Sequence, residues 1–210
     1  CPPRASRYIL VDFIQKNDRP ASVSFFTVAE LHKIANTLEI PGLRGQLEEY
    51  LVDESKRSVN ALIQCLLIFA LTTVSRPTEE FIFSKAAANF LAIAKADNFQ
   101  SLSFRVLSSL LCRCDLNVPN ELAVADVTLL WLAGQRESPS YTPGILAFLR
   151  SHLLHPAEAD AVLERARALR FTNENAASVA RSLRSSHSAS ASATRAASAV
   201  LRRPRTRRRA

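Results

Sequence analysis

Apolar residues recur along most of this chain at the spacing that places them on one face of an α-helix. The segment that contains Leu31, Ile34 and Leu38 is one clear case, with the i, i+3, i+7 pattern of such a face. Only 4 of the 210 residues are Gly, which disfavours a β-structure rich in tight turns. The recurrence predicts an all-α fold of roughly eight helices, arranged as an array of antiparallel helix pairs. The predicted stripes are Leu31, Ile34, Ala35 and Leu38; Leu43, Leu47 and Leu51; Leu62, Leu66, Phe69 and Ala70; Ile82, Ala86, Phe90 and Ile93; Leu107, Leu110 and Leu111; and Val124, Val127, Leu130 and Trp131.

Polar residues and prolines predict where these helices begin and end. Thr27 and Glu30 form a capping box, in which the hydroxyl and the carboxylate satisfy the first unpaired amides of a helix. The dipeptide Pro41-Gly42 predicts a break between two helices, and Arg76-Pro77 predicts the end of a helical unit. The resulting helices have about 8–15 residues and short connections. The other predicted caps are Ser58, Thr78, Ser103, Asn120, Thr142 before Pro143, and His155 before Pro156.

Two apolar segments need a separate interpretation. Residues 8–14 show no clear period, and their sequence leaves strand and helix as alternatives. The longest apolar stretch, residues 61–74, covers about 14 positions, which is shorter than the ~20 needed to span a bilayer. We therefore predict a buried core helix in the second segment and no membrane partner.

The net charge of +8 is distributed unevenly along the chain. Residues 1–180 hold 18 Lys and Arg against 19 Asp and Glu, which gives a net charge of −1. Residues 181–210 hold 9 Arg and no acidic residue, in a sequence dominated by Ser, Ala and Arg. The first part is therefore predicted to be a nearly neutral folded body, and the second a disordered basic tail.

Residue patterns for catalysis or metal binding are weak. The Cys112-x-Cys114 pair lacks a second pair of ligands at the spacing of a zinc site, and His152 and His155 straddle a predicted helix break. No arrangement of Ser, His and Asp stands out as a catalytic triad. We therefore expect no enzyme, no metal and no cofactor, with His155 as a helix cap, His152 facing solvent and His32 on a polar surface. The 4 cysteines favour reduced thiols over a disulfide framework.

An ordered series of residues runs through the middle of the chain: Asn89-Phe90, Phe99-x-x-Leu102-Ser103, Leu107, Leu110-Leu111, Leu116-Asn117-Val118, Glu121, Val124 and Trp131. This series closely resembles the BACK domain of BTB–Kelch (Kelch-like) proteins, in which it runs along consecutive helix pairs. The segment from Glu30 to Leu43 is similar to the last helices of a BTB domain. Residues 145–154 and 156–158 are similar to the closing helices of a BACK domain.

The resemblance covers about residues 8–170 and predicts three parts. They are residues 1–55 as the C-terminal part of a BTB domain, 56–170 as a BACK domain, and 171–210 as a disordered tail. Asn120 stands where the family commonly has Ser, and Ala125 where it has a larger apolar residue; packing tolerates both changes. Because the chain starts at Cys1 rather than Met, we expect a fragment or a gene model that lacks its front, and therefore a truncated BTB remnant. No Kelch repeats follow Leu169 in this sequence.

The resemblance implies the function of a non-enzymatic adaptor for a cullin–RING ubiquitin ligase. The implied partners are a cullin scaffold, an unknown protein substrate and a second copy bound through the BTB front, in the cytoplasm or the nucleus. In the family, the BTB domain and the first BACK helices hold the N-terminal region of the cullin. By this resemblance, helices at residues 59–71 and 79–92 would line a cullin groove, with Leu62, Leu66 and Phe81 as candidate lining residues. Ordinary core packing is the alternative for each, since periodicity does not separate the two.

The Arg-rich end of the tail is the other feature with a mechanism. It can bind phosphates with salt-dependent affinity, it can act as a nuclear import signal, or it can be low-complexity sequence without a selected role. The alternative function is therefore a nuclear nucleic-acid-associated scaffold that binds nucleic acid through the tail alone. The candidate residues are Arg202, Arg203, Arg205, Arg207, Arg208 and Arg209.

Overall fold

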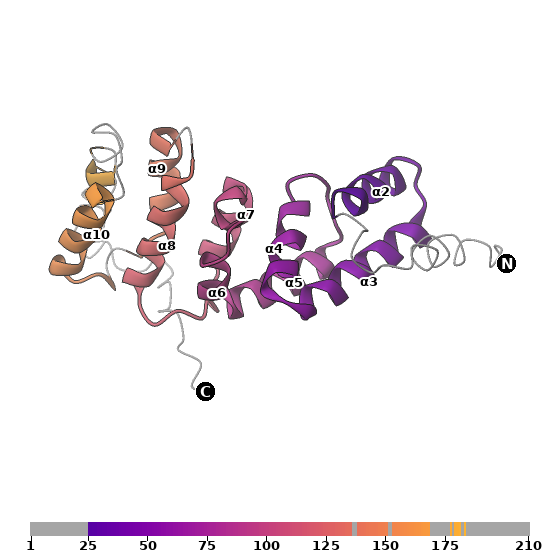
Figure 1. The fold of residues 1–210 in the computed structure, drawn as a ribbon, viewed down its shortest axis with the longest axis horizontal. Helices are drawn as coiled ribbons and strands as arrows, with labels where there is room; N and C mark the ends of the chain where they lie inside the picture. Colours follow the sequence, from indigo (N-terminus) through magenta and orange to yellow (C-terminus); the bar gives the residue numbers. More distant parts are fainter. Residues whose placement is uncertain are drawn as a thin grey trace, which may run out of the picture. The chain divides into compact units, whose positions relative to one another are not determined.

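The computed structural model describes residues 25–135, 138–150, 153–168, 177, 179–181 and 183, and every regular element in these ranges is a helix (Figure 1). The predicted all-α fold is therefore confirmed for the described part of the chain. Residues 8–14, whose sequence leaves strand and helix open, lie outside it. In chain order the helices are α2 (Phe25–Thr37), α3 (Pro41–Arg57), α4 (Val59–Ile68), α5 (Arg76–Ala88), α6 (Phe90–Ala94), the 3-10 helix η1 (Phe99–Ser101), α7 (Phe104–Cys112), α8 (Glu121–Ala133), α9 (Ser138–Leu146) and α10 (Pro156–Ala168).

The chain forms two compact units, and the first, Cys1–Lys85, is called the N-terminal unit below. Its helices α2, α3 and α4 pack against one another, and Figure 1 shows them in indigo and purple. Leu47 and Leu51 of α3 and Leu62 and Leu66 of α4 are each at most 2% exposed. Most of the predicted stripes of these two helices therefore lie in the core of the unit, but Leu43 is half-buried and Ala70 is exposed.

The second unit, Ala86–Ala210, is called the C-terminal unit, and α8 is its central helix. This helix packs against η1, α9 and α10, while α7 packs against α9. Trp131 of α8 is 1% exposed, and its indole Nε1 donates a hydrogen bond to the carbonyl of Leu102 at 2.8 Å. Its ring lies 6.5 Å from that of Phe104 and 5.7 Å from that of Tyr141, between centroids. Trp131 is therefore the aromatic anchor of this unit.

Four of the predicted helix caps are confirmed. Ser58 Oγ accepts from the amide of Ala61 at 3.1 Å, and Ser103 Oγ accepts from that of Val106 at 3.3 Å. Asn120 Oδ1 accepts from the amide of Ala123 at 2.9 Å. Ahead of α10, His155 Nδ1 accepts from the amide of Ala157, and the carboxylate of Glu158 accepts from the amide of His155. These side chains satisfy amides that a helix leaves unpaired at its start.

Three other predicted starts are wrong, because each helix begins earlier than its capping residue. α2 begins at Phe25, so Thr27 lies inside its first turn and forms no capping box. α5 begins at Arg76, so Arg76-Pro77 opens a helix rather than ending a unit, and Thr78 lies inside the first turn. α9 begins at Ser138 and contains Pro143 in its interior. A proline in the first turn loses no intrahelical bond, which explains why α5 can start at that dipeptide.

The predicted buried face of α2 is also wrong. Ile34 and Leu38 are 47% and 62% exposed, whereas Val28, His32 and Ala35 are at most 2% exposed. Both sets follow helical spacing, and α3 and α4 pack against the second. The prediction that His32 lies on a polar surface therefore fails as well. In α8, the sequence likewise predicts that Leu130 is buried with its stripe, but it is 37% exposed.

The end of α2 carries the one positive φ angle found among the described non-glycine residues, 51° at Glu39. The amide of Ile40 donates to the carbonyl of Ala35 at 2.9 Å, and that of Glu39 to the carbonyl of Asn36 at 3.3 Å. This pair of bonds is the Schellman motif, whose left-handed position glycine usually occupies. Glu39 therefore carries local backbone strain.

A few residues of the expected disordered tail are described. Ala177, Val179, Ala180, Arg181 and Leu183 are helical, and Val179 and Leu183 are at most 3% exposed. These two residues lie four positions apart, so they share one face of a helix. The other residues of the predicted tail lie outside the described ranges, so its disorder stays a prediction.

Candidate protein-binding surface

The three candidate partner-binding residues differ in their exposure. Leu62 and Leu66 of α4 are 1% and 0% exposed, so they offer almost no surface to a partner. Phe81 of α5 is 41% exposed. Of the three, Phe81 alone combines a large apolar side chain with access to solvent, and binding at all three stays a prediction.

Charged residues of α3 lie beside the ring of Phe81. The Nζ atom of Lys56 is 5.5 Å from the ring centroid, at the distance of a cation–π contact. The same Nζ donates to Asp53 Oδ1 at 2.8 Å. Phe81 is therefore an exposed aromatic side chain that a Lys–Asp pair flanks on one side.

A buried polar cluster lies in the same unit, around the carboxylate of Glu48. Glu48 belongs to α3 and is 7% exposed. It accepts hydrogen bonds from the amide of Ser75 at 3.0 Å and from Thr78 Oγ1 at 2.8 Å, and also from the hydroxyl of Ser75. Burial raises the pKa of Glu48, but the hydrogen bonds from Ser75, Thr78 and His32 together lower it below its ordinary value.

His32 is the second titratable member of this cluster and is fully buried. Its Nε2 lies 3.3 Å from Glu48 Oε1, and its Nδ1 lies 3.0 Å from Thr72 Oγ1. The side-chain nitrogen Nδ2 of Asn36 donates to Nδ1 of His32 at 3.2 Å. The other ring nitrogen, Nε2, is therefore the one that donates to the carboxylate of Glu48. Sequence reasoning missed this role because the partners of His32 lie 16 and 40 residues away along the chain.

Ser75, His32 and Glu48 are the residue types of a nucleophilic triad, but their connections differ from it. In a triad the imidazole contacts the nucleophile and the carboxylate orients the imidazole. Here the serine hydroxyl and the imidazole each donate to the same carboxylate. The arrangement therefore joins segments of the fold instead of activating a hydroxyl.

Two open pockets lie on the described surface. One, of about 320 Å³, belongs to the N-terminal unit and adjoins the polar cluster; Gly45, Glu48, Glu49, Val52, Asp53 and Thr78 line it. The other, of about 450 Å³, has small apolar walls and two amide side chains; Ala88, Asn89, Leu91, Ala92, Asn117, Val118 and Pro119 line it.

The cysteines occupy contrasting environments. Cys65 of α4 is fully buried, its Sγ donates to the carbonyl of Leu51 at 3.5 Å, and burial raises the pKa of its thiol to about 12. Cys112 and Cys114 are exposed, and Arg150 Nη2 lies 3.5 Å from Cys114 Sγ. Within the described ranges, no three His, Cys, Asp or Glu residues gather in a way that could hold a metal ion. His152 lies outside those ranges.

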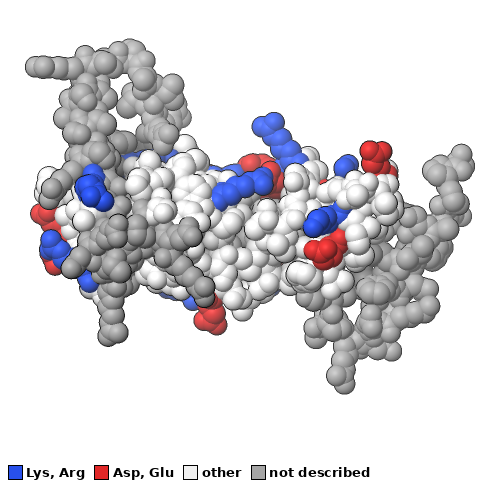
Figure 2. Space-filling view, turned by 90° about the horizontal axis from the view of Figure 1, so that it is seen from above, with Lys and Arg blue, Asp and Glu red and all other residues white. Residues whose placement is uncertain are grey.

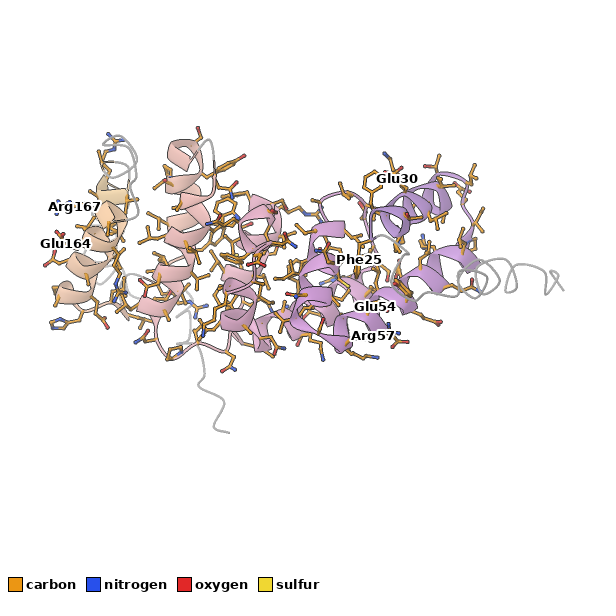
Figure 3. All side chains as sticks on the ribbon, viewed as in Figure 1. Phe25, Glu30, Glu54, Arg57, Glu164 and Arg167 are labelled. Atoms are coloured by element: carbon orange, nitrogen blue, oxygen red, sulfur yellow. The ribbon has the colours of Figure 1, made fainter. Side chains whose placement is uncertain are left out.

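Surface charge is mixed in sign. On the face shown in Figure 2, basic and acidic side chains lie scattered among uncharged ones. Figure 3 labels two pairs that each come from a single helix, Glu54 with Arg57 on α3 and Glu164 with Arg167 on α10. Such pairs support their own helix and add little else. The six candidate arginines from Arg202 to Arg209 lie outside the described residues.

None of the helices in the described part of the chain has both the length and the apolar character that crossing a bilayer requires.

The described helices define an all-α fold of packed helix pairs, and comparison with known proteins shows which family the chain resembles. Residues 65–164 match the sequence model of the family named BACK, "BTB And C-terminal Kelch". Human Kelch-like protein 31 is 24% identical over 130 residues, which are 61% of this chain and 20% of that protein. Kelch-like protein 8 of Caenorhabditis elegans is 27% identical over 154 residues, which are 72% of this chain and 21% of that protein.

These matches confirm the predicted resemblance to the BTB–BACK (Kelch-like) family, and residues 65–164 are the part that resembles a BACK domain. The matched region begins within α4, contains α5 to α9 and ends within α10. The chain spans about a fifth of the length of the two relatives. No solved structure matches the chain.

Proposed function

We propose that this chain is part of a non-enzymatic BTB–BACK adaptor that links a cullin–RING ubiquitin ligase to a protein substrate. The observation that carries the proposal is the match of residues 65–164 to the BACK family. The two relatives named Kelch-like protein support the same class. Packed helix pairs form a stiff support, which suits a protein that holds two partners apart.

The finer division of the chain belongs to the same proposal. Residues 1–55 are proposed as the end of a BTB domain, 56–170 as the whole BACK domain, and 171–210 as a Ser-, Ala- and Arg-rich tail whose few described residues are helical. A homodimer would form through a BTB front, and the protein would act in the cytoplasm or the nucleus.

We propose Phe81 as a contact residue for the cullin. Exposed aromatic side chains are the residues that most often dominate a protein interface, and Phe81 is 41% exposed on a helix of the unit that resembles the cullin-binding part of the family. Leu62 and Leu66 would support the same surface from beneath, since both are buried in the core. The ammonium of Lys56 beside the ring would select a partner with an acidic residue next to its apolar contact.

The test is binding of the full chain to the N-terminal region of a cullin, measured by co-purification and by calorimetry. A second arm uses a fusion that places a BTB front before residue 25. We expect binding in at least the fusion, and we expect Phe81→Asp to weaken it by about tenfold or more, which corresponds to about 1.4 kcal/mol.

Leu153→Asp is the matched control, because Leu153 has the same exposed fraction of 41% but lies in the C-terminal unit. It should leave binding unchanged. A folded fusion that binds no cullin would contradict the adaptor proposal, and equal losses in the two variants would contradict the role of Phe81.

The Arg-rich tail supports the alternative function of a nuclear scaffold associated with nucleic acid. The specific observation is that residues 181–210 carry 9 Arg without any acidic residue. Retention of DNA or RNA should then disappear when residues 181–210 are deleted, and it should fall steeply between about 50 and 200 mM salt. Binding that persists without the tail, or that ignores salt, would exclude this function.

A further inference from the structure

The carboxylate of Glu48 lies where α5 begins, although Glu48 itself belongs to α3. It accepts from the amide and the hydroxyl of Ser75, the residue before α5, and from the hydroxyl of Thr78 in the first turn. The start of a helix has unpaired amides and a positive end of the helix dipole, and both favour an anion. Glu48 therefore caps α5 from a neighbouring helix.

The same cluster ties the connection between α4 and α5 to α2. Thr72 contacts the ring of His32, and the carbonyl of Thr73 accepts from the side chain of Asn36 at 3.2 Å. The amide of Ser75 donates to the carboxylate of Glu48. His32 donates to the same carboxylate, so it links the bonds at Thr72 with those at Ser75. The bonds that hold this connection are thus polar, and those from Ser75, Thr78 and His32 meet at the buried carboxylate of Glu48.

Few apolar contacts hold the connection in addition. Leu71 is 52% exposed, and Thr73, Arg76 and Pro77 are also exposed. The core of α4, by contrast, contains Leu62, Ile63 and Leu66, each at most 1% exposed. Segments with few buried apolar contacts open at a lower free energy than the core that carries them.

We propose that Glu48 and His32 form a charge-dependent latch that holds the α4–α5 connection and the first turn of α5, and that neutralising Glu48 opens this segment while the rest of the N-terminal unit stays folded. Hydrogen bonds to an ionised carboxylate are roughly twice as strong as those to its neutral form. An ionised Glu48 therefore closes the latch, and loss of its charge weakens every bond that meets there.

The groups that face Glu48 are such that the charge of Glu48 decides whether the latch is closed. From α2 it faces the titratable ring of His32, and from the connection and α5 it faces the hydroxyls of Ser75 and Thr78. The sequence of α4 has no charged side chain, and its titratable Cys65 is bonded to Leu51. The hydrogen bonds lower the pKa of Glu48, so acid opens the latch below the ordinary value of 4.5.

The latch rests on these contacts alone, but one consequence rests on the proposed function. Phe81 lies one turn after Thr78 on α5, and it contacts Lys56 of α3. Opening the first turn of α5 displaces the surface that we propose for the cullin. Glu48 is then a positioning residue for that surface, which it does not itself form.

The experiment is amide hydrogen exchange of the full chain, read by mass spectrometry between pH 7 and pH 3 and corrected for intrinsic exchange. In the natural chain, peptides covering residues 71–80 should lose protection below pH 4.5 before those covering α4. Glu48→Gln, a permanently neutral counterpart of similar shape, should exchange about tenfold faster in residues 71–80 at pH 7, with α4 unchanged and the pH dependence lost.

Glu49→Gln is the matched control, since Glu49 is the exposed neighbour of Glu48 and undergoes the same chemical change. It should behave as the natural chain does. The proposal is overturned if Glu48→Gln leaves residues 71–80 protected, if all peptides of the N-terminal unit lose protection together, or if Glu49→Gln has the same effect. Should Glu48→Gln not fold, Thr78→Val removes one donor, and it should loosen the same peptides while keeping their acid dependence. Unchanged exchange in that variant would overturn the latch equally, whether or not the chain binds a cullin.

Discussion

In the N-terminal unit a carboxylate and an imidazole are buried side by side, whereas in the C-terminal unit a large aromatic side chain takes the central place. Polar bonds of Glu48 and His32 join four segments of the chain, namely α2, α3, the α4–α5 connection and α5. Trp131 instead packs against Phe104 and Tyr141 and has a single polar bond to the backbone. The first unit is therefore expected to respond to charge, and the second to lost volume.

The C-terminal unit also contains buried ionisable side chains. Glu121 is 6% exposed and accepts from the backbone amide of Arg150 at 2.9 Å, and Arg150 is 2% exposed. This carboxylate holds the backbone at Arg150, and the carboxylate of Glu48 holds the start of α5. Both units therefore bury a carboxylate that binds a residue distant along the chain.

The largest expected effect comes from Trp131→Ala. The variant leaves a cavity at the centre of the C-terminal unit and frees the carbonyl of Leu102, so we expect a loss of about 3–5 kcal/mol in the free energy of unfolding. Urea unfolding followed by far-UV circular dichroism measures it. Leu130→Ala, at the adjacent but 37% exposed position, should cost about 1 kcal/mol or less. Similar losses in the two variants would mean that Trp131 is not the anchor of its unit.

The second effect tests the response to charge. Glu48→Gln should destabilise the protein by about 1–2 kcal/mol at pH 7. Because the pKa of Glu48 is lowered in the folded state, its contribution is complete above the ordinary value of 4.5 and is lost as the pH falls below it. The gap between the natural chain and the variant, taken from urea midpoints at several pH values, should therefore close in acid. A gap that does not change with pH would contradict this.

A smaller effect should be equal in the two units. Ser58→Ala in the N-terminal unit and Asn120→Ala in the C-terminal unit each remove one cap bond to a helix amide. We expect about 1 kcal/mol for each, because this bond is local and does not depend on the core beneath it. Asn120→Asp, which retains the acceptor, should restore most of the loss in thermal unfolding. Strongly unequal losses of stability in the two variants would show that the contribution of a cap depends on the core beneath it.

The smallest expected effect is a gain in stability. Glu39→Gly removes the side chain from the position with φ of 51° at the end of α2, where glycine carries no steric penalty. Relief of that strain outweighs the greater freedom of glycine in the unfolded chain, so we expect a gain of about 0.5–1 kcal/mol. A higher thermal midpoint checks it. A loss would show that the Glu39 side chain makes a stabilising contact of its own.

Local chemistry accounts for what the sequence predicts well. The caps at Ser58, Ser103, Asn120 and His155 depend on residues two or three positions away, and all four are confirmed. The predicted caps at Thr27, Thr78 and Thr142 fail because the helices continue upstream of them. A hydroxyl inside a first turn has the same sequence signature as a hydroxyl just before one.

Tertiary contacts decide what the sequence leaves open. Helix α2 has two sets of residues at helical spacing, and the set containing Ile34 and Leu38 is the more apolar. The set containing His32 is nevertheless buried, because Glu48 and Thr72, distant along the chain, supply polar partners there. Periodicity likewise did not separate core from groove for Leu62 and Leu66, which are both buried. A pattern identifies a face of a helix, but the neighbouring elements determine whether that face is covered.

Because Cys65 is buried, the reaction of its thiol can report the opening of the N-terminal unit. Its thiol is inaccessible and, with a pKa of about 12, almost entirely protonated, so alkylating reagents reach it only when the N-terminal unit opens. Cys112 and Cys114 are exposed in the C-terminal unit and react without such an opening. Following the mass added at Cys65 over time, with the two exposed thiols as a reference for reaction without opening, yields the rate at which the N-terminal unit opens.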